Sequence, residues 1–127
     1  MIAVDTSALM AILLEEPSVE DCASVLSASS RTLISAGTLA EVHITATMRG
    51  LDMELSALLD RMKFEIVPVT ADVSKRMGQI YSRWGKGAHR ASLNFGDCFA
   101  YDVAKQNDCP LLFIGNDFSH TDIESAL

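Results

Sequence analysis

Four short aliphatic runs, separated by longer stretches with helical periodicity, most constrain how this chain can fold. They occupy residues 2–5, 32–35, 65–69 and 111–114 and consist largely of β-branched and aliphatic residues. Short runs of this composition are typical of strands. Because apolar residues follow one another in them with little polar alternation, the runs favour strands that are buried on both faces of a parallel sheet.

Six other segments repeat apolar residues every three or four positions, which is the spacing of one face of an α-helix. Their markers are Ala8 and Ile12; Val19, Ala23 and Leu26; Leu39, Val42 and Ala46; Leu55, Leu58, Leu59 and Met62; Val73, Met77, Ile80, Tyr81 and Trp84; and Phe99, Val103 and Ala104. Strands that alternate with helices predict an α/β fold with a central parallel sheet of four to five strands, flanked by helices. We expect residues 1–127 to form a single domain, since this length supports one hydrophobic core.

The charge balance limits the ways in which the chain could bind nucleic acid. Ten Lys and Arg residues against 17 Asp and Glu residues give a net charge of −7. Proteins that bind DNA or RNA mainly through phosphate contacts usually have a basic face, so simple sequestration of nucleic acid is disfavoured. Two interpretations stay open and are compatible: the acids gather around divalent cations, or they attract a basic partner protein.

The N-terminus and the cysteines bear on the compartment. The first four residues lead into Asp5 without the basic region or cleavage site of a secretory signal, and the longest apolar stretch, residues 8–14, is too short to span a membrane. We therefore expect a cytoplasmic protein without a membrane segment. Cys22, Cys98 and Cys109 are odd in number and scattered, which favours buried free thiols over disulfides or a zinc site.

Four acidic residues are expected at one edge of the sheet. Asp5 ends the first run, Glu41 lies one turn into the helix after the second run, and Asp117 follows the fourth run after a Gly115-Asn116 turn. In open α/β sheets the carboxyl ends of the strands form the crevice in which ligands bind. Asp97, near the start of the sixth helix, would face the same edge if that helix packs back on the sheet.

Acids gathered in this way favour a metal site. Carboxylates that converge at ~4–6 Å raise one another's pKa unless a cation lies among them. Oxygen ligands without Cys or His nearby suit Mg²⁺ or Mn²⁺. Such ions can activate water and hold a scissile phosphate.

Each acid also has a structural interpretation. Glu41 stands three residues after a Thr, so it could close a capping box at a helix start. Asp97 has the same offset from an Asn and could simply complement the dipole of the following helix. Asp117 could be a turn residue. Asp5 is the hardest to explain structurally, because a charge at the end of an apolar strand contributes little to a fold. The joint placement of the four acids favours a site.

Four motifs appear in order along almost the whole chain: residues 4–9 (VDTSAL), Ala40-Glu41, residues 94–101 (NFGDCFAY), and residues 115–118 (GNDF) with Thr121-Asp122. Together they resemble the PIN-domain ribonucleases and, more narrowly, the VapC-type toxins of bacterial toxin–antitoxin pairs. The resemblance implies a Mg²⁺- or Mn²⁺-dependent endoribonuclease that hydrolyses RNA phosphodiester bonds, built on a parallel sheet flanked by helices.

The resemblance also implies roles for the acids. Asp5 and Asp97 would be the principal metal ligands, Asp117 a variable further ligand, and Glu41 a third ligand or an acid just behind the ligands, so that all four are catalytic. Beside the metal, three polar residues would position ligands, water or substrate: Thr6, Ser7 and Asn116. At Asn116 relatives commonly have Asp, so this chain offers a carbonyl oxygen there but one charge fewer.

Partners follow from the same resemblance. The family's toxins generally form dimers and are silenced by an antitoxin whose basic segment enters the acidic groove, as a complex that can be a heterotetramer. The segment 85–90 is the most basic and the clearest flexible loop, and its Lys86, His89 and Arg90 are expected to contact RNA, although a lone loop His is commonly just exposed to solvent. Asp102 is interpreted as a solvated charge.

Two other function classes remain open at this point. One is a metal-dependent DNA nuclease or phosphatase with a similar acidic edge. The other is a degenerate PIN-like module that binds RNA or protein without cleaving, which Asn116 makes conceivable.

Overall fold

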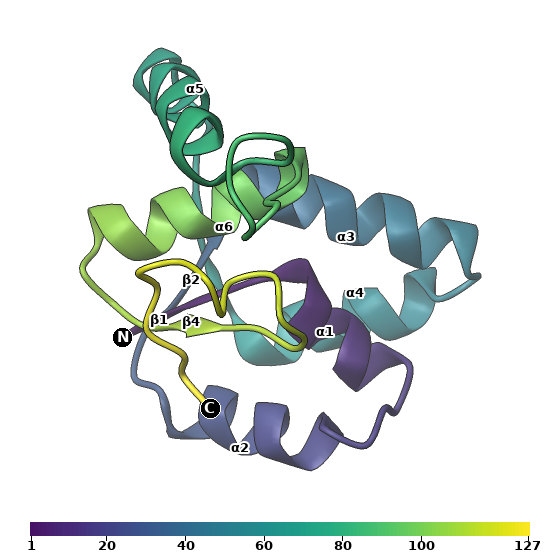
Figure 1. The fold of residues 1–127 in the computed structure, drawn as a ribbon. Helices are drawn as coiled ribbons and strands as arrows, with labels where there is room; N and C mark the ends of the chain where they lie inside the picture. The colour runs from purple at the N-terminus through teal and green to yellow at the C-terminus, as the bar shows by residue number, and fades with distance from the viewer.

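The four aliphatic runs form one parallel sheet in the computed structural model, which describes residues 1–127 (Figure 1). The strands are β1 (Ile2–Val4), β2 (Thr32–Ser35), β3 (Glu65–Val67) and β4 (Leu111–Leu112). Three of them end earlier than predicted. Asp5 follows β1 and caps a helix, and Pro68 cannot continue the hydrogen bonding of β3. After β4, the N–H of Ile114 donates to the hydroxyl of Ser7 and not to a neighbouring strand.

The order of the strands is β3-β2-β1-β4, and every neighbouring pair is parallel. The chain therefore places β2 and then β3 on one side of β1, and later adds β4 on the other side of β1. In open α/β sheets, a reversal of this kind between neighbouring strands opens a crevice at their carboxyl ends. Asp5 lies directly at the end of β1, and Asp117 lies a few residues beyond β4.

All six predicted helices form: α1 (Thr6–Leu13), α2 (Val19–Ala28), α3 (Ala36–Met48), α4 (Asp52–Met62), α5 (Ala71–Trp84) and α6 (Phe95–Gln106). Alternate strand residues face opposite layers, as expected for a sheet buried on both sides. Ala3, Leu33 and Leu111 share a core with α5 and α6, whereas Val4 and Ile34 belong to the core with α1 to α4. None of the helices combines the length and the apolar character needed to cross a membrane.

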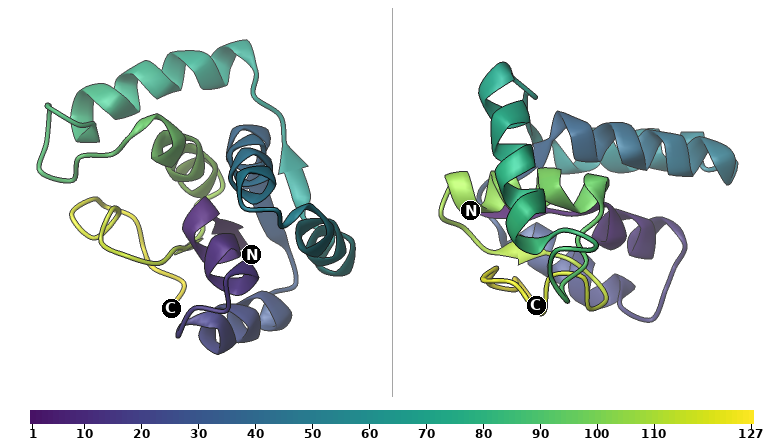
Figure 2. Two further views of the ribbon diagram at one scale, coloured as in Figure 1. Left: turned by 90° about the vertical axis from the view of Figure 1, so that its right-hand side faces the viewer. Right: turned by 45° about the horizontal axis from the view of Figure 1, so that its top comes forward.

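Helix α5 lies across the outer side of α6 (Figure 2) and is attached to it by a partly buried ion pair. Asp102 on α6 is only 3% exposed and accepts from Arg76 Nε at 2.6 Å and from Arg76 Nη2 at 3.1 Å. The interpretation of Asp102 as a solvated charge is therefore wrong. Its partner stands 26 residues earlier on another helix, which the local pattern of the sequence does not reveal.

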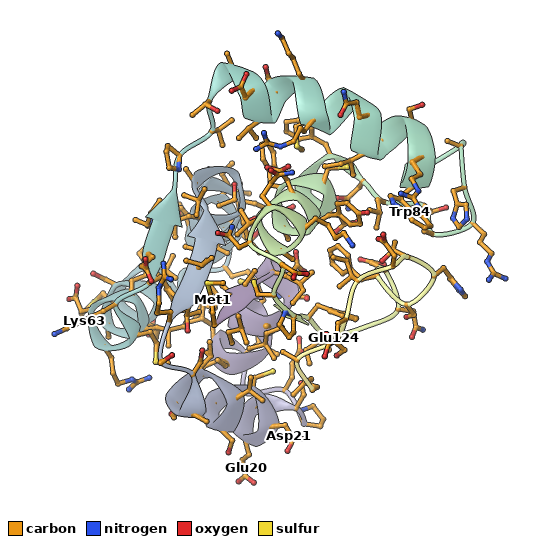
Figure 3. The ribbon with its side chains drawn as sticks, turned by 90° about the vertical axis from the view of Figure 1, so that its left-hand side faces the viewer. Met1, Glu20, Asp21, Lys63, Trp84 and Glu124 are labelled. Atoms are coloured by element: carbon orange, nitrogen blue, oxygen red, sulfur yellow. The ribbon has the colours of Figure 1, made fainter.

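A second polar chain joins α5, α6 and the C-terminal segment. Trp84, at the end of α5 (Figure 3), donates from Nε1 to the Tyr101 hydroxyl at 3.0 Å, and that hydroxyl donates to Asp122 Oδ1 at 2.7 Å. Lys105 on α6 pairs with the other oxygen of Asp122 at 3.1 Å. Burial raises the pKa of Tyr101 to about 12, so its hydroxyl keeps the proton that it donates.

The C-terminal segment runs beside β4 without forming a regular fifth strand. Leu111 donates its N–H to Glu124 O and accepts from Ala126 N–H, both at 2.9 Å. Phe118, which is 1% exposed, packs against Phe113 with ring centroids 5.1 Å apart. These contacts fix both ends of the turn that contains Asp117. Of the three thiols, all free, Cys22 and Cys98 are buried and Cys109 is partly buried.

The contact between α3 and α6 depends on a glycine. A Cβ added to Gly37 would lie 2.6 Å from ring atoms of Phe99, a buried residue of α6. We expect Gly37→Ala to lower the free energy of unfolding by about 1–3 kcal/mol because the helices must separate. Urea denaturation measures this change.

Gly78 provides the matched control, because it lies inside α5 and an added Cβ would meet nothing within 4 Å. Gly78→Ala should raise the free energy of unfolding by about 0.5–1 kcal/mol, since alanine is the better helix former. Equal effects of the two substitutions would contradict the close packing at Gly37.

Candidate functional site

Asp5 occupies the carboxyl end of β1 and is almost fully buried, with 4% of its surface exposed. It is itself the residue that caps α1: Oδ2 accepts from Ser7 N at 3.1 Å and from Ser7 Oγ at 2.6 Å. Thr6 and Ser7, the two hydroxyl residues that follow and could also have capped a helix, lie inside α1 instead. The other carboxylate oxygen, Oδ1, is buried and has no hydrogen-bond partner.

Ser7 connects the two strands that flank the crevice. Its hydroxyl donates to Asp5 and accepts from Ile114 N–H at 3.0 Å, so one oxygen atom joins the start of α1 to the segment after β4. The position predicted for Ser7 beside the acids is the one that it occupies. It contacts Asp5 and, through Ile114, the backbone that leads to Asp117.

Asp97 lies in the first turn of α6 and is 7% exposed. Asn94 and Asp97 form a capping box: Asn94 Oδ1 accepts from Asp97 N–H at 2.8 Å, and Asp97 Oδ2 accepts from Asn94 N–H at 3.0 Å. The structural interpretation of Asp97 is thus confirmed, and it does not exclude a second role. The cap uses Oδ2 and leaves Oδ1 without a hydrogen bond.

Glu41 lies in the second turn of α3, and its capping interpretation is wrong. Helix α3 begins at Ala36 and is capped by Ser35, whose Oγ accepts from Gly37 N–H at 3.1 Å. The Glu41 carboxylate instead accepts a short hydrogen bond from the Thr6 hydroxyl of α1. On its other side it faces Gly96, where any Cβ would overlap the carboxylate.

Electrostatics connects the four acids. Burial, joined by the negative charges of Asp5, Asp117 and Glu41, raises the pKa of Asp97 to about 7, and the hydrogen bond from the Asn94 N–H opposes this rise. Burial also raises the pKa of Asp5, with the Ser7 hydrogen bonds opposing this effect and the charge of Glu41 adding to it. The fold therefore brings the four predicted acids close enough for their charges to act on one another.

Asp117 and Asn116 stand at the exposed margin of this group. The turn that carries them begins at Gly115, whose φ of +96° favours glycine, and ends at the buried Phe118. Asn116 accepts through its backbone carbonyl from Ser119, and its exposed side chain makes no contact with the acids. Of the two, Asp117 alone influences Asp97.

The donor set is the one that a hard cation requires, although no three His, Cys, Asp or Glu side chains are arranged to enclose a metal ion by themselves. Mg²⁺ usually binds one or two carboxylates and keeps several water molecules. The unpartnered Oδ1 of Asp5 and the free Oδ1 of Asp97 fit that mode of binding. A buried carboxylate oxygen without a donor is costly unless a cation compensates it.

The segment 85–90, called the basic loop from here on, is held by hydrogen bonds that the sequence did not predict. Lys86 N–H donates to Leu93 O, and Leu93 N–H donates to Trp84 O, both at 3.0 Å, which closes the loop at its base. His89 is half-buried: Nδ1 accepts from Ala91 N–H at 3.0 Å, and the ring meets Trp84 edge-on with centroids 4.8 Å apart. Lys86 and Arg90 extend into solvent.

Gly96 is a site residue that the sequence analysis did not select. Its lack of a side chain makes room for the Glu41 carboxylate between α3 and α6. A glycine in the first turn of a helix, directly before a buried acid, is a signal that could have identified it, since glycine is unfavourable inside helices.

The chain is similar in sequence to the PIN domain and to a known ribonuclease. The sequence profile of the PIN domain matches residues 2–124. Over 126 residues the chain is 40% identical to Ribonuclease VapC30 of Mycobacterium tuberculosis, covering 97% of this chain and 96% of that protein.

Two solved structures share the fold. The crystal structure of Mycobacterium tuberculosis VapC20, a toxin that cleaves the sarcin–ricin loop, aligns with a TM-score of 0.78 at 17% identity over 97% of this chain and 96% of its own. A chain of a toxin–antitoxin complex from Klebsiella pneumoniae aligns with a TM-score of 0.75 at 16% identity, covering 100% of this chain and 98% of its own.

The raised pKa of Asp97 predicts how stability depends on pH without divalent cations. A carboxyl whose pKa is higher in the folded than in the unfolded state contributes stability below the unfolded pKa of about 4 and loses it as the pH rises to about 7. Asp97→Asn keeps an oxygen for the Asn94 N–H but removes the charge. In EDTA at pH 8 the variant should melt higher than the wild type, by about 4 °C or more, and the difference should shrink towards pH 4.

Millimolar Mg²⁺ supplies the control for the same melting curves. It should raise the melting temperature of the wild type and leave Asp97→Asn nearly unchanged, since the variant lacks the charge that the cation neutralises. If the Asp97→Asn variant melted below the wild type at pH 8, the charge of Asp97 would not destabilise the folded protein, and the prediction would be wrong.

Proposed function

The chain belongs to the PIN-domain family, and we propose that it is a metal-dependent endoribonuclease that hydrolyses RNA and acts as the toxin of a toxin–antitoxin pair. The observation that carries the proposal is the pair of Asp5 and Asp97, two buried carboxylates that each keep one oxygen free of hydrogen bonds. The whole of residues 1–127 serves as one ribonuclease domain in this proposal.

Asp5 and Asp97 are the residues that would hold Mg²⁺ or Mn²⁺, with Asp117 as a further ligand from the exposed margin. A bound divalent cation supplies two things to phosphoester hydrolysis: a lowered pKa for water and stabilisation of the charge that develops on the phosphate. The exposed margin leaves access for RNA, which a fully enclosed metal site would not. The chain's own task is to hold these carboxylates in place before substrate arrives.

Three of the four acids, Asp5, Asp97 and Glu41, have a positioning residue of their own. Ser7 orients Asp5 through its two donated hydrogen bonds, Asn94 orients Asp97 through the capping box, and the Thr6 hydroxyl orients Glu41. Glu41 also lines a hollow of about 430 Å³ between α3 and the start of α6. From there its free oxygen can accept a proton from an attacking water molecule, which makes Glu41 the candidate general base.

RNA would reach this site along the basic loop. Lys86 and Arg90 are exposed cations on a loop whose base is fixed by hydrogen bonds, so they can meet phosphates with little loss of conformational freedom. His89 contributes by holding the loop against Trp84, and its Nε2, which makes no hydrogen bond within the chain, can bind a phosphate. Unpaired RNA suits a shallow edge site, because its backbone can bend into the crevice.

Partner proteins complete the proposal. The net charge of −7 and the acidic crevice suit an antitoxin with a basic segment, and the Klebsiella pneumoniae relative in fold is itself part of a toxin–antitoxin complex. Exposed aliphatic side chains on α3 and α4, namely Ile44, Met48 and Met53, offer apolar surface for a homodimer, which two antitoxins would extend to a heterotetramer. RNA and antitoxin both imply a cytoplasmic protein.

Hydrolysis of RNA is tested by comparing substrates and carboxylate variants. The wild type with Mn²⁺ should cleave single-stranded RNA, and leave single-stranded DNA and a small phosphoester intact. Asp5→Asn and Asp97→Asn should each lower the rate at least about a hundredfold, because each removes a charge that holds the cation. Asp60→Asn, at an exposed carboxylate of α4, is the matched control and should keep full activity.

Other outcomes of this assay contradict the proposal. Cleavage of DNA or of the small phosphoester with equal efficiency would favour a less specific nuclease or a phosphatase. Binding of RNA without Mn²⁺ uptake at millimolar concentration, and without cleavage, would favour a non-catalytic binding module.

Gly96 gives a separate test of Glu41. Gly96→Ala should displace the Glu41 carboxylate by steric overlap and lower cleavage about tenfold or more, a typical contribution of a general base being larger still. When Glu41 is already replaced by Gln, Gly96→Ala should lower the cleavage rate almost no further, because both substitutions disable the same carboxylate. An equal loss in both backgrounds would show that Gly96 acts through something other than Glu41.

A further inference from the structure

The first residue of α6, Phe95, is a large aromatic side chain that the fold leaves 72% exposed beside the carboxylates. It borders a hollow of about 520 Å³ between α5, the basic loop and the start of α6. Tyr81 of α5, itself 41% exposed, and Met77 form the facing wall, and Lys86 of the basic loop stands at the margin. None of the roles assigned above uses this hollow.

The ring of Phe95 contacts a second aromatic ring of α6 on one side. It meets Phe99 edge-on, with centroids 5.0 Å apart, and Phe99 is buried against Gly37 of α3. One side of the Phe95 ring thus contacts a buried aromatic residue, and most of its surface stays exposed. An aromatic platform of this kind is what proteins use to stack unpaired bases.

The polar residues that line the hollow favour a ligand with a negative charge and with groups that accept hydrogen bonds. Lys86 is its one charged residue, and no Asp or Glu lines it, although the chain as a whole has a net charge of −7. Asn94 also lines it. Its Oδ1 is used in the α6 cap, whereas its Nδ2 makes no hydrogen bond and remains available as a donor.

The hollow adjoins the proposed active site through the same short segment. Asn94 contributes to the hollow and caps α6, and its capping partner is the carboxylate of Asp97. Phe95 lies between them and also lines the hollow that contains Glu41 on its other side. A ligand on Phe95 is therefore a near neighbour of the reacting phosphate.

We propose that this hollow binds one unpaired nucleobase of the RNA, stacked on Phe95 with Tyr81 opposite, while Lys86 contacts the adjoining phosphate. The proposal rests on the ribonuclease function proposed above and adds to it a base-binding subsite. It assigns to Phe95 the task of fixing the register of the strand, so that a particular phosphodiester lies at Asp5 and Asp97.

Binding in EDTA tests the stacking without hydrolysis. A fluorescently labelled single-stranded RNA that the wild type cleaves is titrated with each protein, and anisotropy gives the Kd. Phe95→Leu keeps apolar bulk but lacks a π face, and should raise the Kd roughly five- to a hundredfold. Phe95→Tyr, the matched control, keeps the ring and should stay within about twofold of the wild type.

Abasic nucleotides locate the base. The same RNA is prepared with one base removed at each position around the cleavage site. One position should weaken binding to the wild type by the factor that Phe95→Leu causes, and should have no further effect on Phe95→Leu, because both changes remove the same stacking contact. In Mn²⁺ the variant should show a raised KM with a smaller change in kcat.

Two results would overturn the base-binding subsite and leave the ribonuclease function intact: an unchanged Kd for Phe95→Leu, or an abasic effect that persists in this variant. A third would be a change in mass, measured by sedimentation, that accompanies the loss of binding, since Phe95 would then be a protein contact. If the wild type failed to cleave RNA in Mn²⁺, the proposed function itself would fall, and the subsite with it.

Discussion

The burial of the Asp5 carboxyl group is the constraint on which the rest of this structure depends. A carboxylate with 4% exposure at the edge of an apolar sheet is unfavourable by itself, and the fold offsets this with hydrogen bonds to one of its oxygens only. Asp97 and Glu41 add further negative charge nearby. Acids whose pKa values are raised together by burial and by like charges are a common feature of functional sites.

The strand order makes this arrangement possible. With β4 beside β1, the chain segments that follow both strands emerge at one edge, and Ser7 joins them through a single hydroxyl. Helix α6 then packs on the same sheet and brings Asp97, while α3 brings Glu41 to the Thr6 hydroxyl. Four segments that are distant in sequence thus meet at one point. Asp5, Asp97 and Glu41 are each held by a hydrogen bond from a neighbouring residue, and Asp117 stands at the exposed margin.

The sequence predicted the helices, the strands and the gathering of the acids, because apolar periodicity and the ends of strands are local features. It failed at the caps of two helices, where neighbouring polar residues compete, and at one ion pair whose partners are far apart in the sequence. Ser35, rather than Thr38, caps α3, because β2 ends directly at Ser35 and leaves no room for a longer connection. Asp102 is buried by Arg76 of another helix, and Asp5 takes the cap that two following hydroxyl residues also could have provided.

The single tryptophan gives the molecule a built-in optical reporter. Trp84 stands where α5 meets the basic loop, with its indole N–H on Tyr101, the edge of His89 against its ring, and the guanidinium of Arg83 4.5 Å from its ring centroid. Indole emission responds to hydrogen bonding and to nearby charge. Movement of the loop would therefore change the colour and intensity of the protein's own fluorescence, with no label attached.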